Sequence, residues 1–390
     1  MDTPPTTLDV EGAVRTRYAG AARQAEAALC CPVQYDARYL DVLPAELIER
    51  DYGCGDPSRY VRPGDTLLDL GCGGGKVCYI AAQVVGPQGH VIGVDMNDEM
   101  LALARRYQSQ IGDAIGYHNT RFFKGRIQDL ALDLERFAAY LEKQPVRSSD
   151  DWLAAQAAAA EMRLTEPMIG DEMIDVVVSN CVLNLVAQDQ RQRMFAEVYR
   201  VLRRGGRAVI SDIVCDEPVP ERLRNDPQLW SGCISGAFVE HEMIEAFAAA
   251  GFYGMEIVER QEQPWAVVEG IEFRSMTVRA FKGKDGPCRD HRQAVIYNGP
   301  FSRVTDDDGH VLVRGVRTAV CEKTFQIYTR PPYAEQVTAV PPLEGVRPED
   351  APPFDCRRGA VRDPRETKGN ARKSTMLPVS DGCDPGSDCC

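Results

Sequence analysis

A glycine-rich turn between a strand-like run and a helix-like run restricts the fold of this chain more than any other feature. Residues 66–70 are mostly apolar but include Asp69, residues 71–75 are four glycines and a cysteine, and residues 75–85 have helix-like spacing. Glycines at such a position let the backbone turn sharply and approach a ligand closely, with helix N-terminal amides facing it. The pattern predicts a strand, a ligand-binding loop and a helix.

Strand-like and helix-like runs continue to alternate after this turn. The strand-like runs lie at residues 91–94, 121–123, 174–179 and 207–213, and helix-like runs lie at 100–107 and 192–202. The run at 174–179 is largely apolar, as expected of a strand covered on both faces. This alternation predicts an α/β fold with a parallel sheet and helices on both faces. After a helix-like run at 242–250, the runs at 255–258 and 276–281 are expected to add an antiparallel edge.

The patterning divides the chain into four segments. Residues 12–50 have helix-like patterning, and residues 1–60 are expected to form an N-terminal helical lid that carries thiols. Residues 61–284 hold the alternating elements, and an alanine-rich insertion at 132–172 predicts a helical hairpin at the surface. Short β-like runs at 285–335 indicate a small C-terminal α+β domain. The proline-rich residues 336–390 are expected to form a mobile tail.

Two carboxylates accompany the glycine-rich turn. Asp95 ends the second strand, 24 residues after Gly71, where its carboxylate can accept hydrogen bonds from both hydroxyls of a ribose. Lys76 stands where a dinucleotide-binding motif needs its third glycine, which weakens that interpretation. Asp69 suits an ammonium or sulfonium group and would be out of place beside a pyrophosphate. The pattern favours a positively charged nucleoside.

Together with residues 125–130 after the third strand, this motif resembles the class I S-adenosylmethionine-dependent methyltransferases over residues 65–215. The resemblance implies a Rossmann-like, doubly wound sheet and S-adenosylmethionine as the cofactor. We expect Asp69, Gly71 and Gly73 at the methionine end of the cofactor and Asp95 and Met96 at its ribose. Ile127 and Gln128 are expected at the adenine. Asn180 would line the inner wall, and Tyr52 would close over the cofactor.

Composition and charge limit the partners that the protein can bind and the cellular compartment in which we expect it. The 45 Lys and Arg residues against 58 Asp and Glu give a net charge of −13, which argues against nucleic acid. The N-terminus lacks a signal-peptide pattern, and no apolar stretch is long enough to span a membrane. We therefore expect a cytoplasmic monomer without a membrane partner, whose fourteen cysteines are mostly reduced. No cysteine pair has C-x-x-C spacing, so a structural zinc site is not expected.

Three cysteines lie where loops of such a sheet bind ligands. Cys54 precedes the first strand between two glycines, Cys181 ends the fourth strand, and Cys233 lies after the fifth strand among small residues. Ligands of open α/β sheets bind at the carboxyl ends of the strands. Packing explains each cysteine alone equally well, but three thiols that converge at this edge predict a trigonal site for a soft ion.

The segments around these cysteines carry a more specific resemblance. Residues 52–55, 177–186 and 233–237 resemble the three cysteine motifs of the arsenite S-adenosylmethionine methyltransferases, and residues 76–79 and 293–299 also resemble family segments. The likeness covers residues 12–330. One departure is Gly232, where animal members carry a glutamate, and residues 132–172 and 354–359 lie outside the pattern.

This resemblance implies roles for five cysteines. Cys54, Cys181 and Cys233 would bind As(III), the substrate. Cys30 and Cys31 occupy the region of a fourth, N-terminal family cysteine, so either is expected to form a disulfide with Cys54 during turnover. Thioredoxin or glutathione, as thiol reductant, would reset that disulfide. The pyramidal arsenic would direct its lone pair at the methyl group, and no general base would be needed.

Two other functions remain open from the sequence. One is a class I methyltransferase for an organic substrate, with the cysteines as packing residues. The other is a soft-metal sensor or sequestering protein that retains the fold, against which the intact glycine loop and Asp95 argue. The sequence does not distinguish mono-, di- and trimethylated products, nor arsenite from methylarsenite or antimonite.

Overall fold

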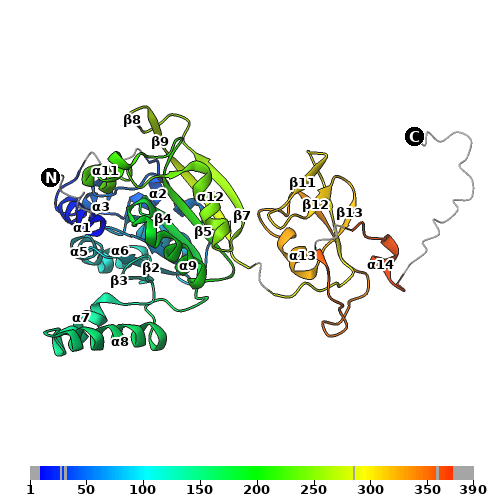
Figure 1. Ribbon diagram of the computed structural model, residues 1–390, viewed down its shortest axis with the longest axis horizontal. Coiled ribbons are helices and arrows are strands. Elements are labelled where there is room, and N and C mark those ends of the chain that lie inside the picture. The colour runs from blue at the N-terminus through cyan, green and yellow to red at the C-terminus, as the bar shows by residue number, and fades with distance from the viewer. Residues whose placement is uncertain (1–8, 27–28, 30–32, 284–285, 357–359, 372–390) are drawn as a thin grey trace, which may run out of the picture. The chain divides into compact units, whose positions relative to one another are not determined.

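The structure, a computed structural model, describes residues 9–26, 29, 33–283, 286–356 and 360–371 (Figure 1). The chain forms two compact units, Met1–Gly283 and Lys284–Cys390. The helices before residue 61 belong to the same unit as the sheet, so the boundary expected there does not separate two compact units. Among the described residues, no helix combines the length and the apolar character needed to cross a membrane.

The first unit is built on a nine-stranded sheet with the order β3-β2-β1-β4-β5-β9-β7, in which β6 pairs with β5 and β8 with β9. Its strands are β1 (Thr66–Leu70), β2 (His90–Asp95), β3 (Thr120–Lys124), β4 (Ile174–Asn180), β5 (Leu202–Cys215), β6 (Phe238–Val239), β7 (Tyr253–Arg260), β8 (Ala266–Val268) and β9 (Ile271–Phe281). The first five strands pair in parallel, and β9 and β7 pair antiparallel. The predicted doubly wound sheet and its antiparallel edge are confirmed.

The helices of this unit follow the predicted alternation. They are α1 (Val10–Ala21), α2 (Ala37–Leu40), α3 (Ala45–Glu49), α4 (Lys76–Val85), α5 (Asp98–Arg106), α6 (Gln108–Ile115), α7 (Leu134–Lys143), α8 (Ser149–Thr165), α9 (Arg191–Val201), α10 (Glu221–Arg224), α11 (Pro227–Ser231) and α12 (Glu240–Ala249). Short 3-10 helices are η2 (Pro57–Tyr60), η3 (Leu183–Leu185) and η4 (Gln188–Gln190). The inserted segment is the predicted helical hairpin, α7 and α8, capped by the side chains of Asp133 and Ser148.

Both faces of the sheet are buried, which explains the continuous apolar runs. In β1, Leu67 packs with residues of α4 and α5, whereas Leu68 and Leu70 pack with residues of α9 and α12. Each of these leucines is fully buried. Burying a leucine side chain stabilises a fold by roughly 1.5–3 kcal/mol. Alternate residues of one strand thus hold helices on opposite faces, and the loops at the strand ends are left to form the site.

The second unit is smaller and mostly β. It contains β10 (Ala294–Tyr297), β11 (Arg303–Thr305), β12 (Val311–Val313), β13 (Arg317–Ala319), β14 (Val337–Val340), α13 (Glu322–Tyr328) and α14 (Pro364–Lys368). Strand β14 pairs with β10, so the prediction of a mobile tail from residue 336 is wrong for this segment. Val337 is buried in the core of the unit, and that burial outweighs the proline-rich composition. Residues 372–390 lie outside the described part of the chain.

Candidate active site

A cavity of about 440 Å³ opens at the carboxyl ends of β1, β2 and β4. The nine predicted cofactor-site residues all line it: Tyr52, Asp69, Gly71, Gly73, Asp95, Met96, Ile127, Gln128 and Asn180. The order of the sheet reverses between β1 and β4, and open α/β sheets bind ligands at such a switch point. The volume suits a small-molecule site.

The glycine loop forms one wall of this cavity. Gly71 has a φ of 67°, and a Cβ atom there would lie 2.5 Å from the side chain of Val182. The amides of Gly71 and Cys72 both donate to the Val94 carbonyl, at 2.8 and 3.1 Å. The turn is therefore fixed by β2 and excludes any side chain at position 71.

Asp95 joins the glycine loop to the far side of the cavity. Its carboxylate accepts hydrogen bonds from the amide of Gly73, at 2.9 Å, and from the amide of Asn97, at 2.8 Å. Burial raises the pKa of this carboxyl, although these backbone bonds oppose the rise. An ionised carboxylate has about four acceptor positions, so Asp95 retains capacity for ribose hydroxyls.

Asp69 is a buried acid at the base of the cavity. Burial raises its pKa to about 7, and a hydrogen bond from the thiol of Cys78, at 3.2 Å, opposes that rise. Among the described residues, no ion pair neutralises it. A buried carboxyl without a cationic partner fits a ligand that brings its own positive charge. Cys78 itself is fully buried.

The three predicted substrate thiols meet beside this cavity, in one buried apolar cluster. Cys54 and Cys181 form a disulfide with a Cα–Cα distance of 5.9 Å. The buried Cys233 thiol donates a hydrogen bond of 3.3 Å to the Cys181 carbonyl. Cys181 also lines the cavity, so the thiol cluster and the cavity share a wall.

Cys30 and Cys31 lie outside the described residues, so the exchange expected between Cys54 and either of them stays a prediction. Asn180, the neighbour of Cys181, contacts the Cys54 loop. Its Oδ1 accepts from the amides of Cys54 and Gly55 at 2.7 and 3.1 Å, and its Nδ2 donates to the Gly55 carbonyl at 2.7 Å. One side chain thus holds the Cys54 loop against the end of β4.

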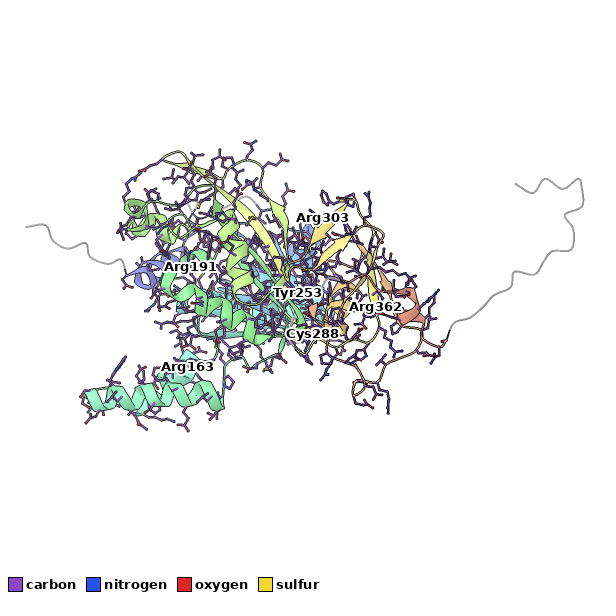
Figure 2. The ribbon with its side chains drawn as sticks, turned by 45° about the vertical axis from the view of Figure 1, so that its right-hand side comes forward. Arg163, Arg191, Tyr253, Cys288, Arg303 and Arg362 are labelled. Atoms are coloured by element: carbon purple, nitrogen blue, oxygen red, sulfur yellow. A yellow bond between two sulfur atoms is a disulfide. The ribbon has the colours of Figure 1, made fainter. Side chains whose placement is uncertain are left out.

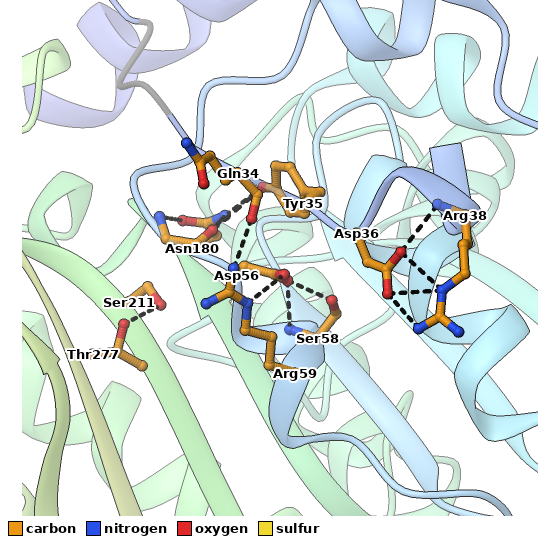
Figure 3. A network of polar contacts seen from close by, with 11 residues as sticks. Gln34, Tyr35, Asp36, Arg38, Asp56, Ser58, Arg59, Asn180, Ser211 and Thr277 are labelled. Carbon is orange, nitrogen blue, oxygen red and sulfur yellow. Dashed lines mark hydrogen bonds and ion pairs between the residues drawn. The ribbon is translucent and has the colours of Figure 1, made fainter. Parts of the chain in front are cut away.

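The surroundings of the Cys54 loop explain its glycines (Figure 3). Asn180 also donates to the hydroxyl of Tyr35 at 3.1 Å, and the hydroxyls of Ser211 and Thr277 share a hydrogen bond of 2.8 Å on the neighbouring strands. A Cβ at Gly55 would lie 2.6 Å from the Ser211 hydroxyl. Only glycine allows the loop to approach the sheet this closely.

Cys181 and Cys233 adopt a backbone conformation that side chains rarely occupy. Their φ values are 60° and 62°. Such left-handed residues cost about 1–3 kcal/mol each and cluster at functional sites. The Cys181 amide donates to the Ser211 carbonyl at 2.8 Å, and the Cys233 amide to the Trp230 carbonyl at 3.0 Å. The surrounding structure imposes the strained geometry on two of the three thiols.

Asp212 is a site residue that sequence reasoning missed. Its carboxylate and the sulfurs of Cys181 and Cys233 lie within 4.8 Å of one another. It accepts hydrogen bonds of 2.8 Å from the Leu183 amide and from the side chain of Asn184, which follow Cys181. Burial raises its pKa to about 6. A carboxylate from β5 therefore lies beside the third cysteine, where Gly232 supplies none.

Helix α1 connects the cavity with the third thiol. Tyr18 lines the cavity, and its ring lies edge-on to that of Tyr52 with 6.1 Å between the ring centroids. The pKa of Tyr18 is raised mainly by burial and further by the nearby Cys233. The Arg17 guanidinium donates to the Gln228 carbonyl at 2.7 Å, on α11, just before the Cys233 loop. Sequence reasoning did not single out Tyr18, which lies within the helix-like N-terminal segment.

Comparisons with known proteins agree with this geometry. A family described as a methyltransferase domain matches residues 62–262, and one described as a domain of unknown function matches residues 284–372. The chain is 31% identical to an arsenite methyltransferase of Aquipseudomonas alcaligenes, over 72% of this chain and 75% of that protein. It is 28% identical to a mouse arsenite methyltransferase, over 76% of this chain and 72% of the mouse protein.

Among solved structures, an arsenic(III) S-adenosylmethionine methyltransferase from Chlamydomonas reinhardtii is similar, with a TM-score of 0.52 and 28% identity. The match covers 86% of this chain and 99% of that one. The methyltransferase family matches about half of the chain, and the cavity lies at the switch point of the sheet. The protein is therefore an S-adenosylmethionine-dependent methyltransferase. The identity to the Aquipseudomonas enzyme across most of its length is specific, and the chain belongs to the arsenite methyltransferase family.

The raised pKa of Asp69 predicts a pH-dependent affinity for S-adenosylmethionine. Below pH 7 the carboxyl of the free protein is mostly protonated, and a positively charged ligand must displace that proton. The affinity is expected to rise by up to about tenfold per pH unit between roughly pH 5.5 and 7. Ionisation of Asp69 over the same range opposes folding of the ligand-free protein, because the folded pKa lies above the unfolded one.

Calorimetric titrations at several pH values measure this dependence. The Asp69→Asn variant has no ionisable group at this position and is expected to show a flatter profile. An equally steep profile in the variant would contradict the role assigned to Asp69.

Proposed function

We propose that this protein transfers methyl groups from S-adenosylmethionine to trivalent arsenic held by the thiolates of Cys54, Cys181 and Cys233. The observation that supports this proposal most is the position of Cys181, which belongs both to the thiol cluster and to the wall of the cavity. Arsenic bound there lies at the inner end of the cofactor site. The names of the relatives support the same substrate.

Binding begins with reduction of the Cys54–Cys181 disulfide. A dithiol reductant of the thioredoxin type, or glutathione, supplies two electrons and two protons, and two thiols result. Arsenous acid then forms three arsenic–sulfur bonds, and its three hydroxyl groups leave as water with the thiol protons. Trivalent arsenic is soft and prefers sulfur to imidazole or carboxylate ligands.

The protein positions the substrate and needs no proton transfer at the reacting atom. S-adenosylmethionine, when bound, supplies an electrophilic methyl group on a positively charged sulfur. The three sulfurs leave the lone pair of arsenic directed away from them. The apolar cluster around the thiols excludes water from the arsenic. Asn180 holds the Cys54 loop in register with Cys181.

The Cys54–Cys181 disulfide supports the proposal that these two cysteines supply the electrons that turnover requires. Methylated arsenic is formally pentavalent, and two electrons return it to the trivalent state. Cys54 and Cys181 supply both electrons when their two arsenic–sulfur bonds break and their sulfurs join in the disulfide seen in the structure. The methylated arsenic(III) stays on Cys233 and takes up a hydroxide from water, which releases a proton, or a thiolate from the reductant. The external reductant then restores the thiols. Cys30 and Cys31 remain candidates for relaying this exchange.

A reductant experiment tests this function. Oxidised protein with arsenite and S-adenosylmethionine is expected to form no methylated arsenic, and protein reduced and then desalted is expected to stop after a single turnover. Added thioredoxin with its reductase, or glutathione, is expected to restore multiple turnovers. Chromatography with mass detection identifies the arsenic species. Binding of S-adenosylmethionine, measured by calorimetry in each redox state, is the control.

Repeated turnover by oxidised protein without reductant would contradict the thiolate site. Phenylarsine oxide binds two close thiolates, so the reduced protein is expected to capture one more equivalent than a Cys54→Ser/Cys181→Ser double variant. Equal capture by the two proteins would indicate that these cysteines only pack around an organic-substrate site.

A further inference from the structure

A second group of three cysteines lies in the C-terminal unit. Cys288, Cys321 and Cys356 place their sulfurs within 4.8 Å of one another (Figure 2 labels Cys288). Cys321 is buried, whereas Cys288 and Cys356 are partly exposed. The group is therefore enclosed on one side and open to a ligand from solvent on the other. The domain of unknown function matches all three residues.

Backbone hydrogen bonds hold the three cysteine segments together. The Phe354 amide donates to the Cys288 carbonyl at 3.0 Å, and the Asp290 amide donates to the Pro352 carbonyl at 2.9 Å. The Glu322 amide, next to Cys321, donates to the Arg289 carbonyl at 2.8 Å. Segments from three parts of the sequence thus meet at fixed positions. The site is built by the fold and does not depend on a single flexible loop.

Hydrogen bonds within the group act most strongly on Cys321. The Cys321 sulfur accepts a hydrogen bond from the Thr324 amide at 3.4 Å and lies 3.2 Å from the Thr324 hydroxyl. Burial opposes ionisation, but hydrogen bonds from Thr324, Cys356 and Cys288 outweigh it and lower the pKa of Cys321. Burial and the bond with Cys288 raise the pKa of Cys356. A lower pKa raises the thiolate fraction of Cys321, and the thiolate is the form that binds a soft ion.

The set of ligands distinguishes among soft ions. Within the described part of the chain, three sulfurs form this group and no histidine or carboxylate completes it. Structural zinc sites require four protein ligands in a tetrahedron. A trivalent ion with a lone pair, such as As(III), needs three ligands in a pyramid. We propose that Cys288, Cys321 and Cys356 form a second As(III)-binding site, separate from the site of methylation.

The binding step balances without a redox partner. Arsenous acid exchanges its three hydroxyl groups for three sulfurs, and the three thiol protons leave with them as three molecules of water. Arsenic stays trivalent throughout. The second site therefore binds arsenic without S-adenosylmethionine and without the Cys54–Cys181 disulfide changing state. This inference stands apart from the proposed function, because neither site supplies a ligand to the other.

Arsenic content of the reduced full-length protein tests the second site. After incubation with excess arsenite and gel filtration, arsenic per chain is measured by mass spectrometry. Cys288→Ser, Cys321→Ser and Cys356→Ser are each expected to lower the content by the same single equivalent and to leave methylation unchanged. Cys215→Ser, which removes a lone buried thiol, is the control and is expected to lose no arsenic. Cys181→Ser is expected to lose the other equivalent together with methylation.

Unchanged arsenic content in all three variants would overturn the second site, and so would tightly bound zinc that arsenite does not displace. Loss of arsenic only in Cys181→Ser would leave the proposed function intact and refute this inference alone. If a variant fails to fold, alkylation of the unmodified protein provides the test. Arsenite is expected to protect Cys288 and Cys356 from iodoacetamide, and equal labelling with and without arsenite would overturn the proposal.

Discussion

Replacing Cys181 with serine is expected to abolish arsenite methylation. Serine oxygen is a hard ligand and does not replace a thiolate on trivalent arsenic. We expect activity under reducing conditions to fall by about a thousandfold or more, equivalent to about 4 kcal/mol of transition-state stabilisation. Affinity for S-adenosylmethionine is expected to stay near normal, because the substitution leaves Asp69, Asp95 and the glycine loop in place. Methylated arsenic and calorimetric binding measure the two effects separately.

The matched control is Cys215→Ser. Cys215 is buried in the same apolar cluster, and its thiol donates to the Phe238 carbonyl at 3.3 Å. It lies outside the group of Cys181, Asp212 and Cys233, so the control variant is expected to retain activity. Retained activity in Cys181→Ser would exclude the three-thiolate site, and equal losses in both variants would point to damage of the cluster rather than of a ligand.

The Asp95→Ala variant is expected to lose most of its affinity for S-adenosylmethionine. The change removes the acceptor for the amides of Gly73 and Asn97 and the acceptor available to the ribose. Hydrogen bonds to a charged group contribute about 1.5–3 kcal/mol each, so we expect the dissociation constant to rise by about a hundredfold or more. Binding of arsenite to the reduced thiols is expected to persist. Calorimetry with each ligand distinguishes the two.

Asp98→Ala provides the comparison for Asp95. Asp98 begins α5, is 65% exposed and pairs with Lys124 on the surface. Exposed pairs of this kind contribute about 0–1 kcal/mol, so its loss is expected to leave cofactor affinity within a few-fold of normal. Similar losses in both variants would argue against a specific contact from Asp95.

The order of the central elements was predictable because buried strands and helices need apolar residues at regular spacings in the sequence. The run at 174–179 was read as a strand covered on both faces, and β4 is buried on both. The meeting of Cys54, Cys181 and Cys233 was expected for a topological reason, since loops at the carboxyl ends of parallel strands share one edge. The short β6 and β8 were missed because two or three residues carry no period.

The parts of the site that sequence reasoning missed depend on contacts between distant segments. Asp212 lies in an apolar strand, and its position beside the thiols follows from the loop after Cys181 folding back onto β5. The pairing of Cys54 with Cys181 follows from the hydrogen bonds of Asn180. In the second unit, β14 lies among prolines, which favoured the prediction of a mobile tail. Its partner, β10, lies about 40 residues earlier in the chain, so the sequence near β14 gives no sign of the pairing.

Helix α1 contacts both halves of the site. It lines the cofactor cavity with Tyr18, accepts a hydrogen bond of 3.0 Å from the Asn97 side chain at the Arg15 carbonyl, and supports α11 through Arg17. One helix thus touches the wall of the cavity and the segment that precedes the third thiol. We expect a change that displaces α1 to weaken cofactor binding and to loosen the Cys233 loop together.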